Sequence, residues 1–100
     1  MTPGGQDRAP TIYLFTQDGC ANCPAAKAVI DEAFDGTNVV LETVDLQAMD
    51  SDFEFKLLEH QVFIASTPSI IIENGGNLRL LYSGEVPTVE QIQREVLNAA

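Results

Sequence analysis

The sequence predicts a single α/β domain in which a four-stranded mixed sheet is flanked by three helices, in the order βαβαββα. Two strand-like segments are each followed by a segment with helical periodicity, and a hairpin signal then joins the last two strands. A length of 100 residues suits one domain with an ordinary apolar core. The right-handed crossover rule makes the first two strands parallel, so the segment after the first strand lies where open α/β sheets usually place their chemistry.

The first third of the chain supplies a leader, a strand and a helix. Residues 1–10 are rich in proline and glycine, so we expect a flexible leader ahead of a domain over residues 11–100. Thr11–Thr16 holds four apolar residues in succession, which is typical of a central strand covered on both faces. Cys23–Phe34 has apolar residues at helical spacing, and the stop signal Asp35-Gly36 follows it.

The middle of the chain predicts a second strand and a second helix. Val39–Leu46 is rich in β-branched and aliphatic residues, as in a strand. Ser51 and Glu54 then form a candidate capping box for an amphipathic helix. The apolar residues expected on this helix are Phe53, Leu57, Leu58 and Val62.

The last third predicts a hairpin and a third helix. Ser69–Glu73 and Leu78–Tyr82 flank the turn sequence Asn74-Gly75-Gly76-Asn77, so these strands are antiparallel neighbours. Thr88 with Gln91 caps a final helix. We expect Val89, Ile92, Val96 and Leu97 on its apolar face, and five aromatic side chains mainly in the core: Tyr13, Phe15, Phe53, Phe55 and Phe63.

The segment Cys20-Ala21-Asn22-Cys23-Pro24 holds the only two cysteines of the chain and lies where the first strand turns into the first helix. A thiol at a helix N-terminus faces unpaired N–H groups and the positive end of the helix dipole, which favour the thiolate. Two intervening residues let the second sulfur close a disulfide. The pattern therefore indicates redox chemistry, with a fixed structural disulfide and half of a zinc site as alternatives.

The acidic composition disfavours two classes of partner. Fifteen acidic and five basic residues give a net charge of −10, which would repel nucleic acid backbones and anionic membranes. No apolar run is long enough to span a bilayer, and residues 1–8 lack the pattern of a signal peptide, so we expect a soluble, cytoplasmic protein. The charge could steer basic partners or reflect solubility or adaptation to high salt.

The element order and two motifs resemble the thioredoxin and glutaredoxin superfamily, in particular its small, glutaredoxin-sized thioredoxins. The motifs are the cysteine pair and Ser66-Thr67-Pro68-Ser69-Ile70, and the resemblance covers roughly residues 11–98. It implies a thioredoxin-like domain in which Pro68 follows a cis peptide bond and faces the cysteines. The backbone of Thr67 would then pair with an extended substrate segment.

The chain departs from both branches of the superfamily. Gly19 precedes the first cysteine where thioredoxins usually have tryptophan, and Leu14 replaces the usual buried acid six residues before that cysteine. Asp18 stands where glutaredoxins have an upstream lysine, and Gly84 is followed by Glu85 instead of a second glycine. These differences disfavour a pocket for glutathione, which is itself anionic.

The resemblance implies a thiol-disulfide oxidoreductase that reduces protein disulfides. Cys20 would attack as a thiolate and Cys23 would resolve the mixed disulfide, with Pro24 stiffening the first helical turn and Asn22 supporting the loop. We expect no cofactor or metal, a monomer, and a thioredoxin-reductase-type electron donor. The alternatives are a non-catalytic binding or electron-relay module for a dedicated partner, and a metal or iron-sulfur bridge across a dimer.

Overall fold

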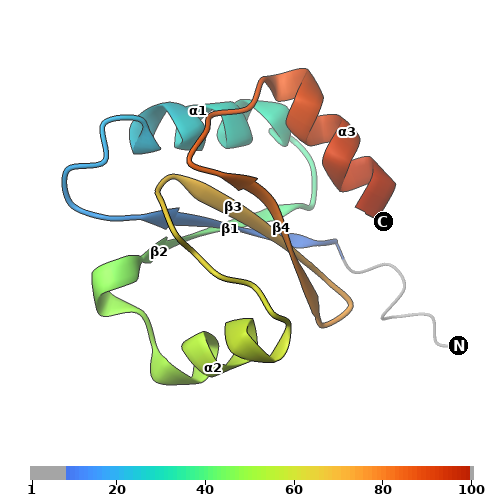
Figure 1. Ribbon diagram of the computed structural model, residues 1–100. Coiled ribbons are helices and arrows are strands. Elements are labelled where there is room, and N and C mark those ends of the chain that lie inside the picture. The colour runs from blue at the N-terminus through green and yellow to red at the C-terminus, as the bar shows by residue number, and fades with distance from the viewer. Residues whose placement is uncertain (1–8, 100) are drawn as a thin grey trace, which may run out of the picture.

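The computed structural model describes residues 9–99, so most of the expected leader lies outside the described residues. The elements are β1 (Thr11–Thr16), α1 (Cys23–Ala33), β2 (Val40–Asp45), the short 3-10 helix η2 (Leu46–Ala48), α2 (Ser51–Glu59), β3 (Ser69–Asn74), β4 (Asn77–Ser83) and α3 (Val89–Ala99). The predicted order βαβαββα is confirmed (Figure 1).

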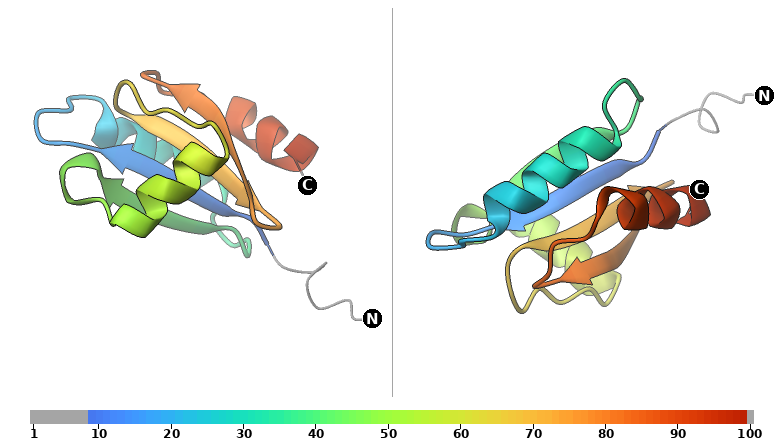
Figure 2. Two further views of the ribbon diagram at one scale, coloured as in Figure 1. Left: turned by 60° about the horizontal axis from the view of Figure 1, so that its bottom comes forward. Right: turned by 90° about the horizontal axis from the view of Figure 1, so that it is seen from above.

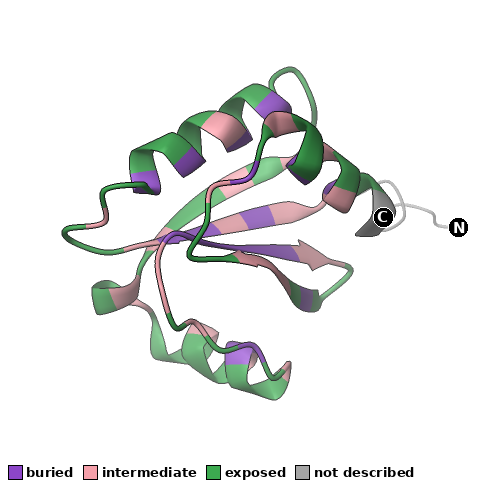
Figure 3. Ribbon diagram, turned by 45° about the horizontal axis from the view of Figure 1, so that its top comes forward, coloured by how far each residue is buried: buried purple, intermediate pink, exposed green. Residues whose placement is uncertain are grey.

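The four strands form one mixed sheet in the order β2-β1-β3-β4. Strand β1 pairs in parallel with β2 and antiparallel with β3, and β3 pairs antiparallel with β4. Helices α1 and α3 cover one face of this sheet and α2 lies on the other (Figures 1 and 2). The sheet edges are therefore β2 and β4, and most β2 residues are exposed (Figure 3).

Alternation of side chains along β1 fills two separate apolar clusters. Ile12 and Leu14 pack in the cluster beneath α1 and α3, whereas Phe15 packs with Ile71 and Leu57 in the cluster beneath α2. All three β1 side chains are fully buried. The prediction of a central strand covered on both faces is confirmed.

Two of the five aromatic side chains that were expected mainly in the core lie at the surface instead. Phe53 lies against the rings of Tyr13 and Phe15, with centroid distances of 4.9 and 5.9 Å. Phe55 is instead 62% exposed and Phe63 66% exposed. The cause is that α2 contacts the sheet along a narrow stripe, in which Leu57 is the only buried residue of the helix.

Two leucines assigned to buried helix faces also lie at the surface. Leu58 on α2 is 57% exposed and Leu97 on α3 is 75% exposed. Ile92 and Val96 of α3 are buried as expected, because they pack over Ile30 and Ala33 of α1. The apolar stripe of each helix is therefore narrower than periodicity predicts.

The N-terminal cap of α3 is the one that the sequence predicts, whereas the cap of α2 is a different residue. Asp50, not Ser51, caps α2, since its carboxylate accepts a hydrogen bond from the Phe53 backbone N–H at 3.3 Å. The reciprocal capping box of α3 is confirmed: the Thr88 N–H donates to the Gln91 side chain at 2.9 Å, and the Gln91 N–H donates to the Thr88 hydroxyl at 3.0 Å.

The β3–β4 hairpin turns at Gly75 and Gly76, whose φ angles of +64° and +88° suit a tight primed turn. The strands extend slightly beyond the predicted bounds, β3 to Asn74 and β4 to Asn77 and Ser83. Among residues 9–99, no helix is both long and apolar enough to cross a membrane.

Candidate functional site

The cysteine loop leaves the carboxyl end of β1 and enters the N-terminus of α1, as predicted. The Cys20 backbone N–H donates to the Gln17 carbonyl at 3.2 Å, which closes a turn. Gly19 inside this turn has φ +84°, a conformation that glycine adopts without a Cβ penalty. Cys20 therefore lies before α1, and Cys23 is the first residue of the helix.

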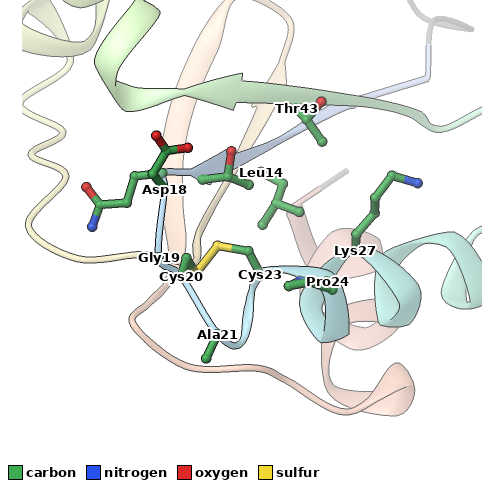
Figure 4. A pocket seen from close by; sticks show the side chains of 11 residues that line it. Leu14, Asp18, Gly19, Cys20, Ala21, Cys23, Pro24, Lys27 and Thr43 are labelled. Atoms are coloured by element: carbon green, nitrogen blue, oxygen red, sulfur yellow. A yellow bond between two sulfur atoms is a disulfide. The ribbon is translucent and has the colours of Figure 1, made fainter.

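The two sulfurs form a disulfide in this structure (Figure 4), with an S–S distance of 2.08 Å and a Cα–Cα distance of 5.5 Å. The two residues differ in burial, since Cys23 is only 7% exposed whereas Cys20 is partly exposed. A disulfide-bearing partner can therefore approach Cys20 more readily than Cys23.

The N-terminus of α1 presents an uncompensated positive end to the cysteines. Pro24 lies in the first turn, where its missing N–H removes no helical hydrogen bond. Asn22 is the N-cap residue, but its side chain makes no capping hydrogen bond, and the first turn contains no acidic residue. The helix dipole is thus available to favour a thiolate once the disulfide is reduced.

A cavity of about 660 Å³ opens beside the disulfide, between α1 and the carboxyl ends of β1 and β2. Leu14 lines it and is fully buried, so no carboxyl lies at this position. Lys27 also lines it, but pairs with Asp31 at 2.9 Å and extends away from the sulfurs (Figure 4). The remaining lining residues are Thr16, Gln17, Asp18, Gly19, Cys20, Ala21, Cys23, Pro24 and Thr43.

The Thr67–Pro68 peptide bond is cis, as the family resemblance implied. Phe15 of β1 pairs with Ser69 of β3, so Pro68 precedes β3 at the same end of the sheet from which the cysteine loop leaves β1. Pro68 is fully buried, and its carbonyl accepts a hydrogen bond from the Gly84 N–H at 2.8 Å. Thr67 and Pro68 do not line the cavity, which lies on the β2 side of the disulfide.

Gly84 matches the close approach of two loops at this edge. Its φ is +77°, and a Cβ there would lie 2.7 Å from the Ser66 hydroxyl oxygen. Ser66 also contacts the Ser83 hydroxyl at 3.3 Å, and its carbonyl accepts a hydrogen bond from Ser69 at 2.5 Å. These contacts tie the Pro68 loop to the end of β4.

His60 lies at the C-terminal end of α2 and outside the lining of the cavity beside the disulfide. Its Nδ1 is 3.0 Å from the Lys56 carbonyl. Within residues 9–99, no group of three or more His, Cys, Asp and Glu side chains is arranged to hold a metal ion.

Sequence reasoning did not find Thr16 and Thr43 in the cavity lining. Leu14 of β1 pairs with Thr43 of β2, so the parallel register places Thr43 next to the position of the missing acid. The signal was present in the crossover rule, because parallel neighbours bring their carboxyl ends to one edge. Locating Thr43 required the register, which the sequence pattern alone does not fix.

Comparison with known proteins supports this fold. No significant match was found among curated protein sequences. The structure resembles a mutant thioredoxin from Halobacterium salinarum, with a TM-score of 0.68, 12% identity, and coverage of 92% of this chain and 75% of that one. It also resembles oxidised thioredoxin from Plasmodium falciparum, with a TM-score of 0.65, 18% identity, and coverage of 91% and 83%.

A third similar structure is an uncharacterised thioredoxin-like protein from Clostridium perfringens, with a TM-score of 0.61, 14% identity, and coverage of 91% of this chain and 71% of that one. The family model described as a thioredoxin domain matches residues 11–97, which is nearly all of the described chain. With its fold and its CxxC pair, this chain belongs to the thioredoxin domain family.

Proposed function

We propose that this protein reduces disulfides in other proteins through a dithiol-disulfide cycle of Cys20 and Cys23. The observation that carries the proposal is the CxxC pair at an uncompensated helix N-terminus, with one partly exposed and one buried cysteine. General thiol-disulfide oxidoreductase chemistry follows from the family and this pair.

The cycle begins with both cysteines reduced. The Cys20 thiolate attacks one sulfur of the substrate disulfide, forms a mixed disulfide, and releases the other substrate sulfur as a thiolate that takes up a proton. The Cys23 thiolate then attacks the Cys20 sulfur, restores the Cys20–Cys23 disulfide, and releases the second substrate thiolate. Two electrons have then passed from the protein to its substrate.

The surrounding residues have separate roles in this proposal. The backbone of Thr67, ahead of the cis-Pro68 bond, holds an extended substrate segment by β-strand addition. Pro24 stiffens the first turn of α1, and Asn22 completes the loop between the sulfurs. The Cys23 thiol has no carboxyl acceptor at Leu14, so its proton passes to water, to a free thiolate or to another carboxylate; Asp18 lines the adjoining cavity.

The proposed setting follows from the charge and the chemistry. A thioredoxin-reductase-type donor supplies two electrons and two protons to regenerate the dithiol, so the protein acts as an electron-transport component without a cofactor of its own. It acts as a monomer in the cytoplasm, where thiols are kept reduced. Its net charge of −10 disfavours nucleic acid and anionic membrane partners.

Variants of the two cysteines test the cycle. Wild-type protein supplied with dithiothreitol should reduce a disulfide-bonded model protein catalytically, and Cys20→Ser should not. Cys23→Ser should stall as a mixed disulfide through Cys20, seen by mass spectrometry as an adduct that dithiothreitol releases. Full activity of Cys20→Ser would refute the proposal.

The same trap separates this function from a dedicated binding or relay module. Many different proteins captured by Cys23→Ser would support a general reductase, whereas one captured protein would favour the dedicated module. Recycling of the oxidised protein by glutathione, rather than by a thioredoxin reductase, would contradict the proposed donor. A metal assay on protein purified without oxidant tests a metal-bridged dimer.

A further inference from the structure

A second cavity, of about 530 Å³, forms an apolar groove on the opposite face of the sheet from α1. It lies between α2 and the segments that precede and follow this helix. Its apolar lining includes Leu46, Met49, Leu57, Leu58, Val62 and Phe63. We call this feature the α2 groove.

Two large apolar side chains at the rim of the α2 groove are mostly exposed. Phe63 is 66% exposed and Leu58 is 57% exposed, while Leu57 and Val62 at its base are buried. Phe55, three residues before Leu58 on α2, is 62% exposed and extends the apolar surface along the helix. Contiguous exposed apolar surface with polar neighbours is characteristic of an interaction site.

A short stretch of chain connects the α2 groove to the Pro68 loop, which lies at the same end of the sheet as the cysteine loop. The segment after Phe63 leads directly through Ser66 to Thr67 and the cis-Pro68 bond. Figure 1 shows this segment running from α2 to the start of β3. A polypeptide bound along Thr67 could therefore continue toward the groove.

The α2 groove has one charged residue in its lining, which is acidic, and the stretch of chain that forms the groove is acidic. Glu54 lines the groove and lies one turn from Leu58 on α2. The same stretch, residues 45–64, also carries exposed Asp45, Asp50, Asp52 and Glu59. Its one lysine, Lys56, pairs with Glu73 at 2.6 Å, so it does not offset this charge.

We propose that the α2 groove is a docking site for the protein partner of the disulfide exchange, and that it takes an apolar segment flanked by lysine or arginine. The partner's apolar side chains contact Leu58 and Phe63, and one of its cations faces Glu54. This inference rests on the proposed function, because it assigns the partner of the same site. A partner with these features gains both burial and charge complementarity.

Two other occupants fit less well. A second copy of this chain would bring together two molecules that each carry a net charge of −10. Residues 1–8 of the same chain offer only Met1 and Pro3 as apolar side chains. The charge therefore favours a different protein that presents a basic segment.

Peptide binding tests the α2 groove without any thiol chemistry. The probe is a synthetic peptide of about 12 residues with leucine and lysine at helical spacing, titrated into the ¹⁵N-labelled Cys20→Ser/Cys23→Ser protein. We expect saturable chemical-shift changes at Leu58 and Phe63, weakening as salt is raised. Matched peptides with glutamate for lysine, or serine for leucine, should bind at least about tenfold more weakly.

Surface variants provide the matched controls. Leu58→Gln/Phe63→Gln should weaken binding of the leucine-lysine peptide by about tenfold or more. The control is Leu97→Gln, which should not change binding, because Leu97 is an exposed large apolar residue on the other face of the sheet. Unchanged binding in the double variant would overturn the proposal. Self-association that increases with concentration and disappears in the same variant would also overturn it, because the occupant would then be a second copy.

A kinetic comparison connects docking to the exchange reaction. We expect the second-order rate constant for reduction of a disulfide peptide to rise about tenfold when the leucine-lysine sequence is added to it, and Leu58→Gln/Phe63→Gln to remove this gain. An unextended disulfide peptide should react equally with both proteins. Failure of all thiol exchange would refute the proposed function, whereas equal rates with both peptides would refute only the docking site.

Discussion

At the scale of single residues, Leu14 distinguishes this site most clearly from the family pattern. Its side chain is fully buried beneath α1 and lines the cavity beside the disulfide, at the position where the family resemblance implies a carboxyl. The chain therefore fills its core with an apolar side chain at this point and offers no carboxyl there to the Cys23 thiol.

Leu14→Asp should restore an acid at a cost in stability. We expect the free energy of unfolding of the oxidised protein to fall by about 2–5 kcal/mol at pH 8, because a buried carboxylate loses hydration and the apolar contacts of leucine. Burial raises the pKa of such a carboxyl above its unfolded value, so the loss should shrink as the pH falls. Urea denaturation at pH 5 and pH 8 measures this, and Leu14→Asn should show a loss that does not depend on pH.

A second residue-scale prediction concerns Tyr13, whose hydroxyl donates to Glu73 at 2.9 Å. Burial, and then this hydrogen bond, raises the pKa of Tyr13 to about 12, from an ordinary value of 10.0. Because the unfolded tyrosine ionises first, Tyr13 stabilises the fold below pH 10 and loses this contribution between about pH 10 and pH 12.

Absorbance of tyrosinate during a pH titration of the folded protein should show the late ionisation of Tyr13, and Tyr13→Phe should remove that part of the signal, leaving Tyr82, whose pKa burial also raises. The melting temperature of Tyr13→Phe should fall less steeply than that of the wild type above pH 10. Glu73→Gln should lower the pKa of Tyr13, since the acceptor is no longer charged. An early Tyr13 titration near its ordinary value in the wild type would contradict this account.

At the scale of elements, α2 is the helix whose sequence signals were least reliable. Asp50 forms its cap, and only one of its residues is buried. Asp50→Ala should lower the free energy of unfolding by about 1 kcal/mol, because the Phe53 N–H loses its acceptor. Ser51→Ala should change it by less than about 0.5 kcal/mol in chemical denaturation. A larger loss of stability in Ser51→Ala than in Asp50→Ala would instead identify Ser51 as the cap.

The elements that could be predicted are those with strong local patterns. Thr11–Thr16 needed only an apolar run, and the α3 cap needed only Thr88 and Gln91, since these signals act within a few residues. The exposure of Phe63 and Leu97 could not be predicted, because periodicity says which residues share a face but not how much of that face meets a neighbour.

The candidate site divides in the same way. The cysteine pair and its place at a helix N-terminus followed from local sequence. The cis bond before Pro68 followed only from the family resemblance, because no local pattern specifies that isomer. The cavity beside the disulfide depends on the register of β1 and β2, which is a tertiary property.

At the scale of the whole molecule, like-charge repulsion opposes folding. The net charge is −10. The ion pairs of Lys27, Lys56 and Arg79 all involve exposed or partly exposed side chains, so each stabilises the fold only slightly against this repulsion. We expect about 0.5 M sodium chloride to raise the melting temperature by several degrees, because it screens the repulsion. Calorimetry at rising salt measures this, and a falling melting temperature would show that attractive pairs dominate.

The position of β2 at the sheet edge has a consequence for storage and handling of the protein. An unpaired edge strand is a template for cross-β growth, and repulsion between carboxylates such as Glu42 and Asp45 on neighbouring copies blocks it. The net negative charge of the whole molecule falls as the pH approaches the isoelectric point of about 4.1, so repulsion between copies weakens there. We therefore expect copies to associate through this edge more readily near that pH than at neutral pH, which light scattering across this range would measure.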